Sequence, residues 1–197
     1  PAQVEQLAEL LVRAEKPMIF AGSQTYWDNA TAELLQLTES LGIPVMMNGM
    51  GRGVLPANHP NVFSLARRRA LRGTDLVLIM GTPLDFRVGF GAGINQTAKI
   101  VQIDRDYTQL GKNRATDLAL AGHSALLLRQ ILDAVGGRAA ALRDKLAPWR
   151  TPRRRNQAAW QACAVYAVAD AAHQPLPVGV GTGRSAGRRS VRNRSYR

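Results

Sequence analysis

The stretch that decides the fold is "DLVLIMGTPLDFRVGFG", residues 75–91. Its apolar run, 76–80, ends at Gly81, and an aspartate (Asp85), an arginine (Arg87) and more glycines follow within ten positions. A strand that is apolar on both faces must be covered on both faces, which is typical of a parallel sheet between layers of helices. The stretch therefore predicts a buried parallel strand that ends in a glycine-rich loop.

The same alternation of helix and strand runs through most of the chain. Apolar spacing predicts helices at 2–14, 28–42, 62–71 and 123–137, and strands at 17–22, 44–47, 75–81, 98–104 and 116–122. Asp28 or Asn29 can cap the second helix, and Gly42 is a natural end for it. We therefore expect an α/β fold over residues 1–137: a doubly wound, Rossmann-like parallel sheet of five to six strands.

The net charge of +12 is concentrated in the last part of the chain. Residues 1–137 hold 13 Lys/Arg and 12 Asp/Glu, whereas residues 138–197 hold 13 Lys/Arg and 2 Asp/Glu. From residue 147 onward the chain has no Glu, Ile, Phe or Met. We therefore expect residues 138–197 to be a basic tail, either disordered or derived from a shifted reading frame.

Composition excludes several classes of protein. No apolar run approaches the roughly 18–20 residues of a membrane span, so no membrane partner is expected. The start of the chain lacks the pattern of a signal peptide, and we expect a cytoplasmic location. Cys163 is the only cysteine, which excludes an internal disulfide. The three histidines (His59, His123 and His173) have no metal-ligand spacing.

Polar and glycine-rich loops follow four of the expected strands: "AGSQ", "NGMGRG", "MGTPLDFR" and "QIDRDY". Ligands of open parallel sheets bind at the carboxyl ends of the strands, where glycine lets a ligand approach backbone amides. Any one of these loops could need glycine only to turn and aspartate only to cap. Four together favour a nucleotide-type ligand or an inherited site that is now empty. The P-loop pattern is absent, and "GMGRG" is not a complete G-x-G-x-x-G.

Several motifs in one register carry a resemblance to a known family. They are "LGIPV" before a glycine-rich loop, "DLVL" with a following glycine and a "DxR"-like element, and "IDRDYTQLGKN". Over about residues 1–135 the sequence resembles the central domain of the thiamine-diphosphate-dependent acetolactate synthase family, whose relatives include pyruvate oxidases, benzaldehyde lyase and 2-hydroxyacyl-CoA lyases.

The resemblance implies an enzyme with thiamine diphosphate and Mg²⁺ that breaks or forms C–C bonds of 2-oxo acids. In the full-length family the flanking domains supply the catalytic glutamate and the Mg²⁺–diphosphate motif, and the enzymes are homodimers or homotetramers. This sequence shows neither element, so we expect no catalytic residue and no metal ligand in it. Its expected partners are flanking catalytic domains.

The resemblance also implies candidate residues for the FAD or ADP-type cofactor that some members hold in this domain. These are Gly22, Ser23, Asn48, Gly49, Met50, Gly81, Thr82, Pro83, Arg87, Asp104 and Arg105. Three departures favour an empty site over FAD: Ser23 replaces a glycine, 84–86 replaces the usual Phe-Asp-Asp, and His123 stands where a helix-capping aspartate is expected.

Two alternatives remain open. One is a free-standing FAD- or NAD-binding oxidoreductase domain, and the other is a basic-tailed nucleic-acid-binding protein, which the poor aromatic spacing does not favour. The cluster Arg67, Arg68, Arg69 and Arg72 is either a phosphate patch or a solvated helix face that meets the acids of a neighbouring domain. Arg87 either pairs with Asp85 or contacts a ligand.

Overall fold

A computed structural model describes residues 2–63 and 67–150 of the chain. Its centre is a five-stranded sheet in the order β2-β1-β3-β4-β5, in which every neighbouring pair is parallel. The strands are β1 (Pro17–Ala21), β2 (Val45–Met47), β3 (Leu76–Met80), β4 (Lys99–Asp104) and β5 (Leu118–Ala121). The expected α/β class and the parallel sheet are confirmed.

The strands are largely buried, and β2, although it is an edge strand, is buried at all of its residues. All residues of β1 and β3, the central strands, are buried, as continuous apolar runs predict. The edge strand β5 alternates between buried and more exposed positions. Successive residues of β1 point to opposite faces: Ile19 belongs to the core of one face, and Phe20 to the core of the other.

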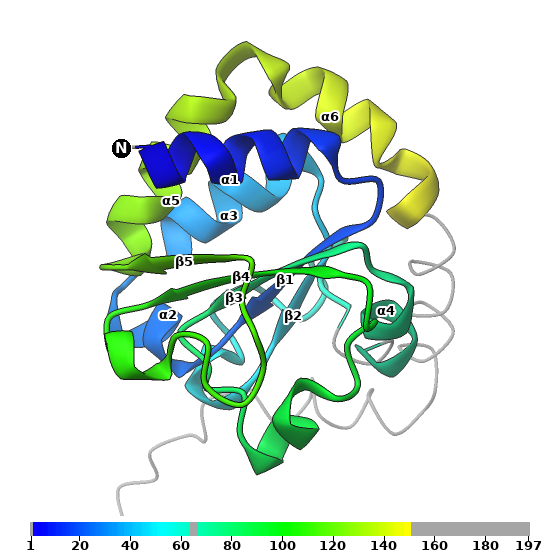
Figure 1. The fold of residues 1–197 in the computed structure, drawn as a ribbon. Helices are drawn as coiled ribbons and strands as arrows, with labels where there is room; N and C mark the ends of the chain where they lie inside the picture. The colour runs from blue at the N-terminus through cyan, green and yellow to red at the C-terminus, as the bar shows by residue number, and fades with distance from the viewer. Residues whose placement is uncertain (1, 64–66, 151–197) are drawn as a thin grey trace, which may run out of the picture.

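One face of the sheet, which we call the four-helix face, is covered by helices (Figure 1). They are α1 (Ala2–Arg13), α3 (Thr31–Leu41), α5 (Ser124–Val135) and α6 (Ala139–Lys145). Helices α1, α3 and α5 present apolar residues at helical spacing; α1, for example, buries Val4, Leu7 and Leu11. These side chains and the sheet form the larger of the two apolar cores.

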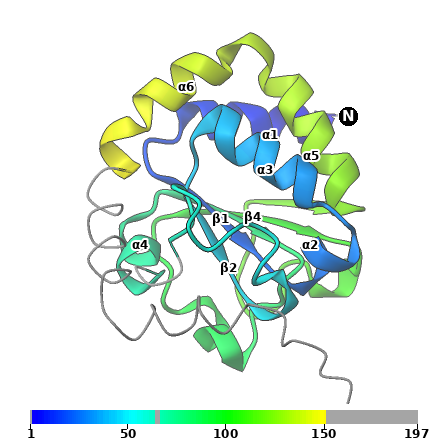
Figure 2. The same cartoon turned by 180° about the vertical axis from the view of Figure 1, so that it is seen from behind.

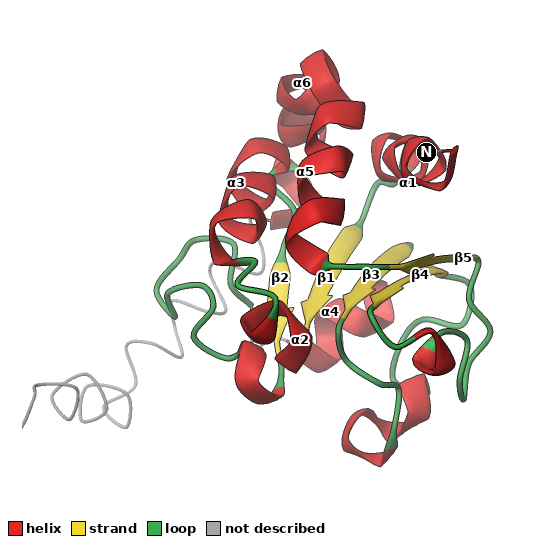
Figure 3. Ribbon diagram, turned by 90° about the vertical axis from the view of Figure 1, so that its left-hand side faces the viewer, coloured by secondary structure: helices red, strands yellow, loops and turns green. Residues whose placement is uncertain are grey.

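The opposite face, which we call the loop face, has a thinner cover (Figure 3). The helix α4 (Arg67–Gly73) and the irregular segment 84–98, with the 3₁₀ segment η2 (Phe86–Gly91), pack on it. Leu84, Ile94 and Leu71 are buried there against Phe20. The prediction of helices on both faces is confirmed, and in the described residues the loop face carries the short helix α4 with an irregular segment beside it.

The packed part of the chain extends past the boundary expected at residue 137. Helix α6 buries Leu142 and is followed by buried Leu146 and Trp149, whose indole N–H donates to the Pro17 carbonyl at 3.0 Å. Lys145 Nζ also donates to the Val12 carbonyl at 2.9 Å. The sequence analysis missed this helix because the basic composition of the segment outweighed its few apolar residues. The remaining tail, with Cys163 and His173, lies outside the described residues.

Two helix starts differ from the expectation. The segment after β1 forms a separate short helix, α2 (Ser23–Trp27), and α3 begins at Thr31 with Ala30 as its N-cap, so neither Asp28 nor Asn29 caps it. The end of α3 is as predicted, since Gly42 adopts a left-handed conformation with φ +67°.

The expected helix 62–71 differs from the structure at Val62, which lies beside β2 in a bridge with Val45. The described helix in this region is α4, Arg67–Gly73. In the part of the chain that the structure describes, no helix is long and apolar enough to cross a membrane.

Candidate functional site

The candidate site lies where the winding of the sheet reverses. In the order β2-β1-β3-β4-β5 the chain moves outward in both directions from the β1–β3 pair, and ligands of such sheets bind beside the carboxyl ends of these two strands. Figure 2 shows the short helix α2 at the end of β1. Gly22 and Ser23 follow β1, Gly81 and Thr82 follow β3, and Asn48 begins the loop after β2.

The loops after β1 and β3 pack directly against each other because their glycines have no side chains. The Gly22 N–H donates to the Met80 carbonyl at 2.8 Å, and a Cβ at Gly22 would overlap the Thr82 hydroxyl and the Gly81 carbonyl. Gly81 has φ +55°, and a Cβ there would overlap the side chain of Gln24. The space that these glycines leave is therefore filled by the chain itself.

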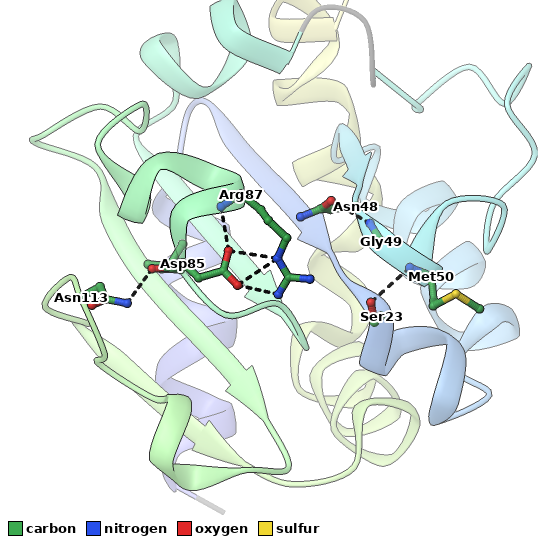
Figure 4. A network of polar contacts seen from close by, with 8 residues as sticks. Ser23, Asn48, Gly49, Met50, Asp85, Arg87 and Asn113 are labelled. Carbon is green, nitrogen blue, oxygen red and sulfur yellow. Dashed lines mark hydrogen bonds and ion pairs between the residues drawn. The ribbon is translucent and has the colours of Figure 1, made fainter. Parts of the chain in front are cut away.

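The loop after β2 is tied to the start of α2 (Figure 4). Ser23 Oγ accepts a hydrogen bond from the Met50 N–H at 3.1 Å, and Asn48 Oδ1 accepts one from the Gly49 N–H at 2.7 Å. A Cβ at Gly49 would lie 2.5 Å from Ser23 Oγ. Ser23, which replaces a glycine of the resembling family, thus accepts a backbone hydrogen bond and joins the loop after β1 to the loop after β2. We call the three joined loops the closed edge.

Arg87 pairs with its neighbour in sequence. Its Nε donates to both carboxylate oxygens of Asp85 at 2.9 and 3.1 Å, and its backbone N–H donates to the same group at 2.9 Å (Figure 4). These hydrogen bonds hold the pKa of Asp85 below its ordinary value. Of the two roles left open for Arg87, the structure has the local ion pair, on a loop that begins at half-buried Pro83.

Asp104 ends β4, and the next residue, Arg105, contacts helix α2 at the end of β1. The Arg105 N–H donates to Gln24 Oε1 at 3.1 Å, and Asp104 Oδ1 accepts from the Asp106 N–H at 2.9 Å. Burial, and secondarily the negative charges of Asp106 and Asp28, raise the pKa of Asp104.

A buried aspartate that the sequence analysis did not single out as a site residue joins three elements. Asp28 is 2% exposed, and its Oδ2 accepts the Ser124 N–H at 2.6 Å, at the start of α5. Its Oδ1 lies 3.2 Å from Arg105 Nη1 and 3.8 Å from His123 Nε2. Asp28 therefore supplies the helix cap that His123 cannot make. The missing cap at "GHSA" was the one signal in the sequence for such a partner.

His59 contacts residues outside the closed edge. His59 Nδ1 accepts from the Asn61 N–H at 3.2 Å, and His59 Nε2 lies 3.5 Å from Glu39. Within residues 2–63 and 67–150, no group of three or more His, Cys, Asp or Glu side chains could hold a metal ion. The arginines of α4 lie on the loop face.

Several backbone amides of the closed edge already donate within the chain. The N–H groups of five loop residues all donate to other atoms of the chain: Gly22, Gly49, Met50, Gly51 and Gly81. Anion sites of this fold class use such amides as free donors. The loops of the closed edge are thus packed on each other, and the Ser23 hydroxyl holds two of them together through its hydrogen bond with the Met50 amide.

The sheet order and the switch point define the class of protein: a doubly wound, Rossmann-like α/β domain. Residues 4–131 match the family model described as "Thiamine pyrophosphate enzyme, central domain". The chain belongs to this family.

Relatives of two kinds match the same part of the chain. The acetolactate synthase large subunit IlvG of Mycobacterium tuberculosis is 47% identical over 102 residues, which are 52% of this chain and 19% of the relative. The 2-hydroxyacyl-CoA lyase 2 of Danio rerio is 44% identical over 112 residues, or 56% of this chain and 18% of the relative. The chain spans about a fifth of the length of these curated relatives.

A solved structure shows the same fold. Benzoylformate decarboxylase from Polynucleobacter necessarius superposes with a TM-score of 0.57 at 21% identity, covering 68% of this chain and 27% of that protein. At this identity the likeness concerns the fold alone.

Proposed function

We propose that this chain acts as the central domain of a thiamine-diphosphate- and Mg²⁺-dependent enzyme of the acetolactate synthase kind. Its substrates are 2-oxo acids or their acyloin products, and its reaction belongs to the C–C bond lyases and transferases. When bound, thiamine diphosphate supplies the chemistry that breaks and forms the C–C bond. The partners are flanking catalytic domains, in a homodimer or homotetramer.

The observation that carries this proposal is the match of residues 4–131 to the central domain of thiamine pyrophosphate enzymes. Acetolactate synthase and 2-hydroxyacyl-CoA lyase both match here, and both names describe chemistry at a C–C bond. The substrate itself is not distinguished, because two kinds of relative share this domain.

The role of this domain, in the same proposal, is to hold its neighbours in place rather than to react. The candidate cofactor residues of the closed edge serve packing: Gly22 and Gly81 admit each other's loops, and Ser23 engages the Met50 amide. We expect no flavin diphosphate at this edge, because five of its backbone amides already donate within the chain.

A domain exchange tests the proposal. Residues 4–131 would replace the matching segment of the Mycobacterium tuberculosis acetolactate synthase, and acetolactate formation from pyruvate would be measured with thiamine diphosphate and Mg²⁺. We expect an active chimera of native oligomeric size. A folded chimera of that size with no activity would contradict the proposal, and the unexchanged enzyme is the control.

The flavin question has a separate test. The purified 197-residue chain would be titrated with FAD and followed by flavin fluorescence, beside the variant Ser23→Gly, which frees the Met50 amide. We expect no saturable binding by the native chain. Tight binding by the native chain would contradict the closed edge and favour the oxidoreductase alternative.

A further inference from the structure

A pocket on the loop face is separate from the closed edge. It has a volume of about 110 Å³ and lies between helix α4 and the segment 84–94. Phe20 and Leu71 line it, together with Leu84, Val88 and Ile94. Most of these side chains are buried in the smaller apolar core, so the pocket is a gap in the cover of the sheet.

Two arginines also line this apolar pocket. Arg67 and Arg68 come from the first turn of α4; Arg67 is half-buried and Arg68 is exposed. The same helix carries Arg69 and Arg72. Among residues 2–63 and 67–150, no carboxylate forms an ion pair with any of the four. The pocket therefore combines an apolar lining with positive charge that the described chain does not neutralise.

One glycine in the wall of the pocket, Gly93, leaves open space beside it. Gly91 and Gly93 line it, and a Cβ at Gly93 would meet no atom within 4 Å. A side chain at position 93 would thus extend into free space without backbone strain, and it can be used to fill the mouth of the pocket.

We propose that this pocket binds a small amphiphilic anion, a carboxylic acid or phosphate monoester with one compact apolar group. The apolar group enters between Leu71, Leu84 and Ile94, and the acid group pairs with Arg67 and Arg68. Guanidinium groups bind carboxylate and phosphate through paired hydrogen bonds, and unpaired charge beside an apolar lining favours such a partner. The proposal is independent of the proposed function and of the closed edge.

The size of the pocket sets the size of the apolar group. An apolar cavity of about 150 Å³ encloses benzene, so a pocket of about 110 Å³ that is open at one side takes up a branched four-carbon group, or most of a phenyl ring with the remainder at its mouth. Benzoate and phenyl phosphate are therefore suitable probes. Benzamide is the uncharged match to benzoate, and inorganic phosphate is the anion without an apolar part.

The experiment is an NMR titration of the ¹⁵N-labelled 197-residue chain with these four compounds. We expect saturable shifts of the Gly91 and Gly93 amides with benzoate or phenyl phosphate, and at least tenfold weaker binding of benzamide and of inorganic phosphate. Benzoate alone, phenyl phosphate alone, or both would support the proposal and would identify the acid group. No saturable shift at millimolar probe would overturn it.

Three variants locate the site. The double change Arg67→Gln with Arg68→Gln should weaken binding at least tenfold, and Gly93→Leu should abolish it while the rest of the spectrum stays native. Arg72→Gln is the matched control, because Arg72 is exposed on the same helix and does not line the pocket. An equal loss for Arg72→Gln, or equal affinity for benzoate and benzamide, would overturn the proposal.

Discussion

The two faces of the sheet are covered in different ways, although the strands between them are buried on both sides. On the four-helix face, leucines and valines at helical spacing form a closely packed core. On the loop face, one short helix and a glycine-rich segment form a smaller core and leave a pocket beside Phe20. The comparison teaches that apolar strands require a cover but do not specify how completely it fills the space.

The largest expected effect tests this difference in packing. Leu128→Ala, on the four-helix face, should lower the free energy of unfolding by about 3–4 kcal/mol, because the site is fully buried and a cavity would remain. Leu71→Ala, beside the pocket, should cost about 2 kcal/mol because it lacks neighbours on one side. Urea unfolding of both variants measures the difference. Equal losses would contradict the comparison.

The next effect concerns Asp28, which joins the end of α2 to the start of α5 and to Arg105 after β4. Asp28→Ala should lower the free energy of unfolding by about 2–3 kcal/mol, because a buried N–H and the guanidinium of Arg105 lose their acceptor. Asp133→Ala is the control, since Asp133 is exposed on the same helix. Thermal and urea unfolding would compare them. A loss for Asp28→Ala no greater than for the control would argue against its capping role.

Replacement of a glycine by alanine should cost more stability in the closed edge than on the loop face. Gly81→Ala should cost about 2 kcal/mol, because φ is +55° and the new methyl group overlaps Gln24. Gly93→Ala should stay within about 0.5 kcal/mol of the native chain, since the position is open. Chemical denaturation of the two variants provides the measurement. A tolerated change at position 81 would show that the edge is looser than the structure indicates.

The smallest effects are two opposite dependences on pH. The Arg129 guanidinium, whose Nε donates to Glu33 at 2.9 Å, lowers the pKa of Glu33, so this stabilisation is present above the ordinary pKa of glutamate and is lost as pH falls through the lowered value. Burial raises the pKa of Asp104, so in the native state this carboxyl group keeps its proton to a higher pH than in the unfolded chain. The stability that this provides is present below the ordinary pKa of aspartate and is lost as pH rises through the raised value.

Replacing Glu33 by glutamine and Asp104 by asparagine separates these two contributions to the pH dependence of stability. Glu33→Gln should cost about 1 kcal/mol near neutral pH and less in acid. Asp104→Asn should stabilise by less than about 1 kcal/mol near neutral pH, with the gain vanishing in acid, because the group is partly screened by solvent. Unfolding free energies measured across pH would show the two slopes. Slopes of the same sign would rule out the assigned causes.

Most of the fold could be predicted because local patterns carry it. The apolar runs 17–21 and 76–80 indicate strands buried on both faces, and the spacing of leucines in 124–135 indicates a helix with one buried side. The helix α6 was missed because its few apolar residues stand in a basic segment. Helix α2 was missed because five residues are too few for a periodic signal.

The sequence could predict which loops share one edge of the sheet, but not whether the backbone amides of those loops are free. The sequence places Gly22, Ser23 and Gly81 at one edge of the sheet, and the structure brings them together there. Whether their amides are free or engaged depends on distances between loops far apart in the sequence, such as Ser23 to Met50. Asp28 was missed as a site residue for the same reason, since its partner Ser124 is 96 residues away.

The sequence by itself determined the parallel sheet, its two-sided burial and the family, because these follow from the local order of apolar, glycine and polar residues. Only the tertiary structure decided that the glycines after β1 and β3 fit into each other, and that the arginines of α4 stand beside a pocket. The physical reason is that a side chain's polarity and a glycine's lack of a Cβ are properties of one residue, whereas a filled space or an engaged amide depends on which distant atoms meet there.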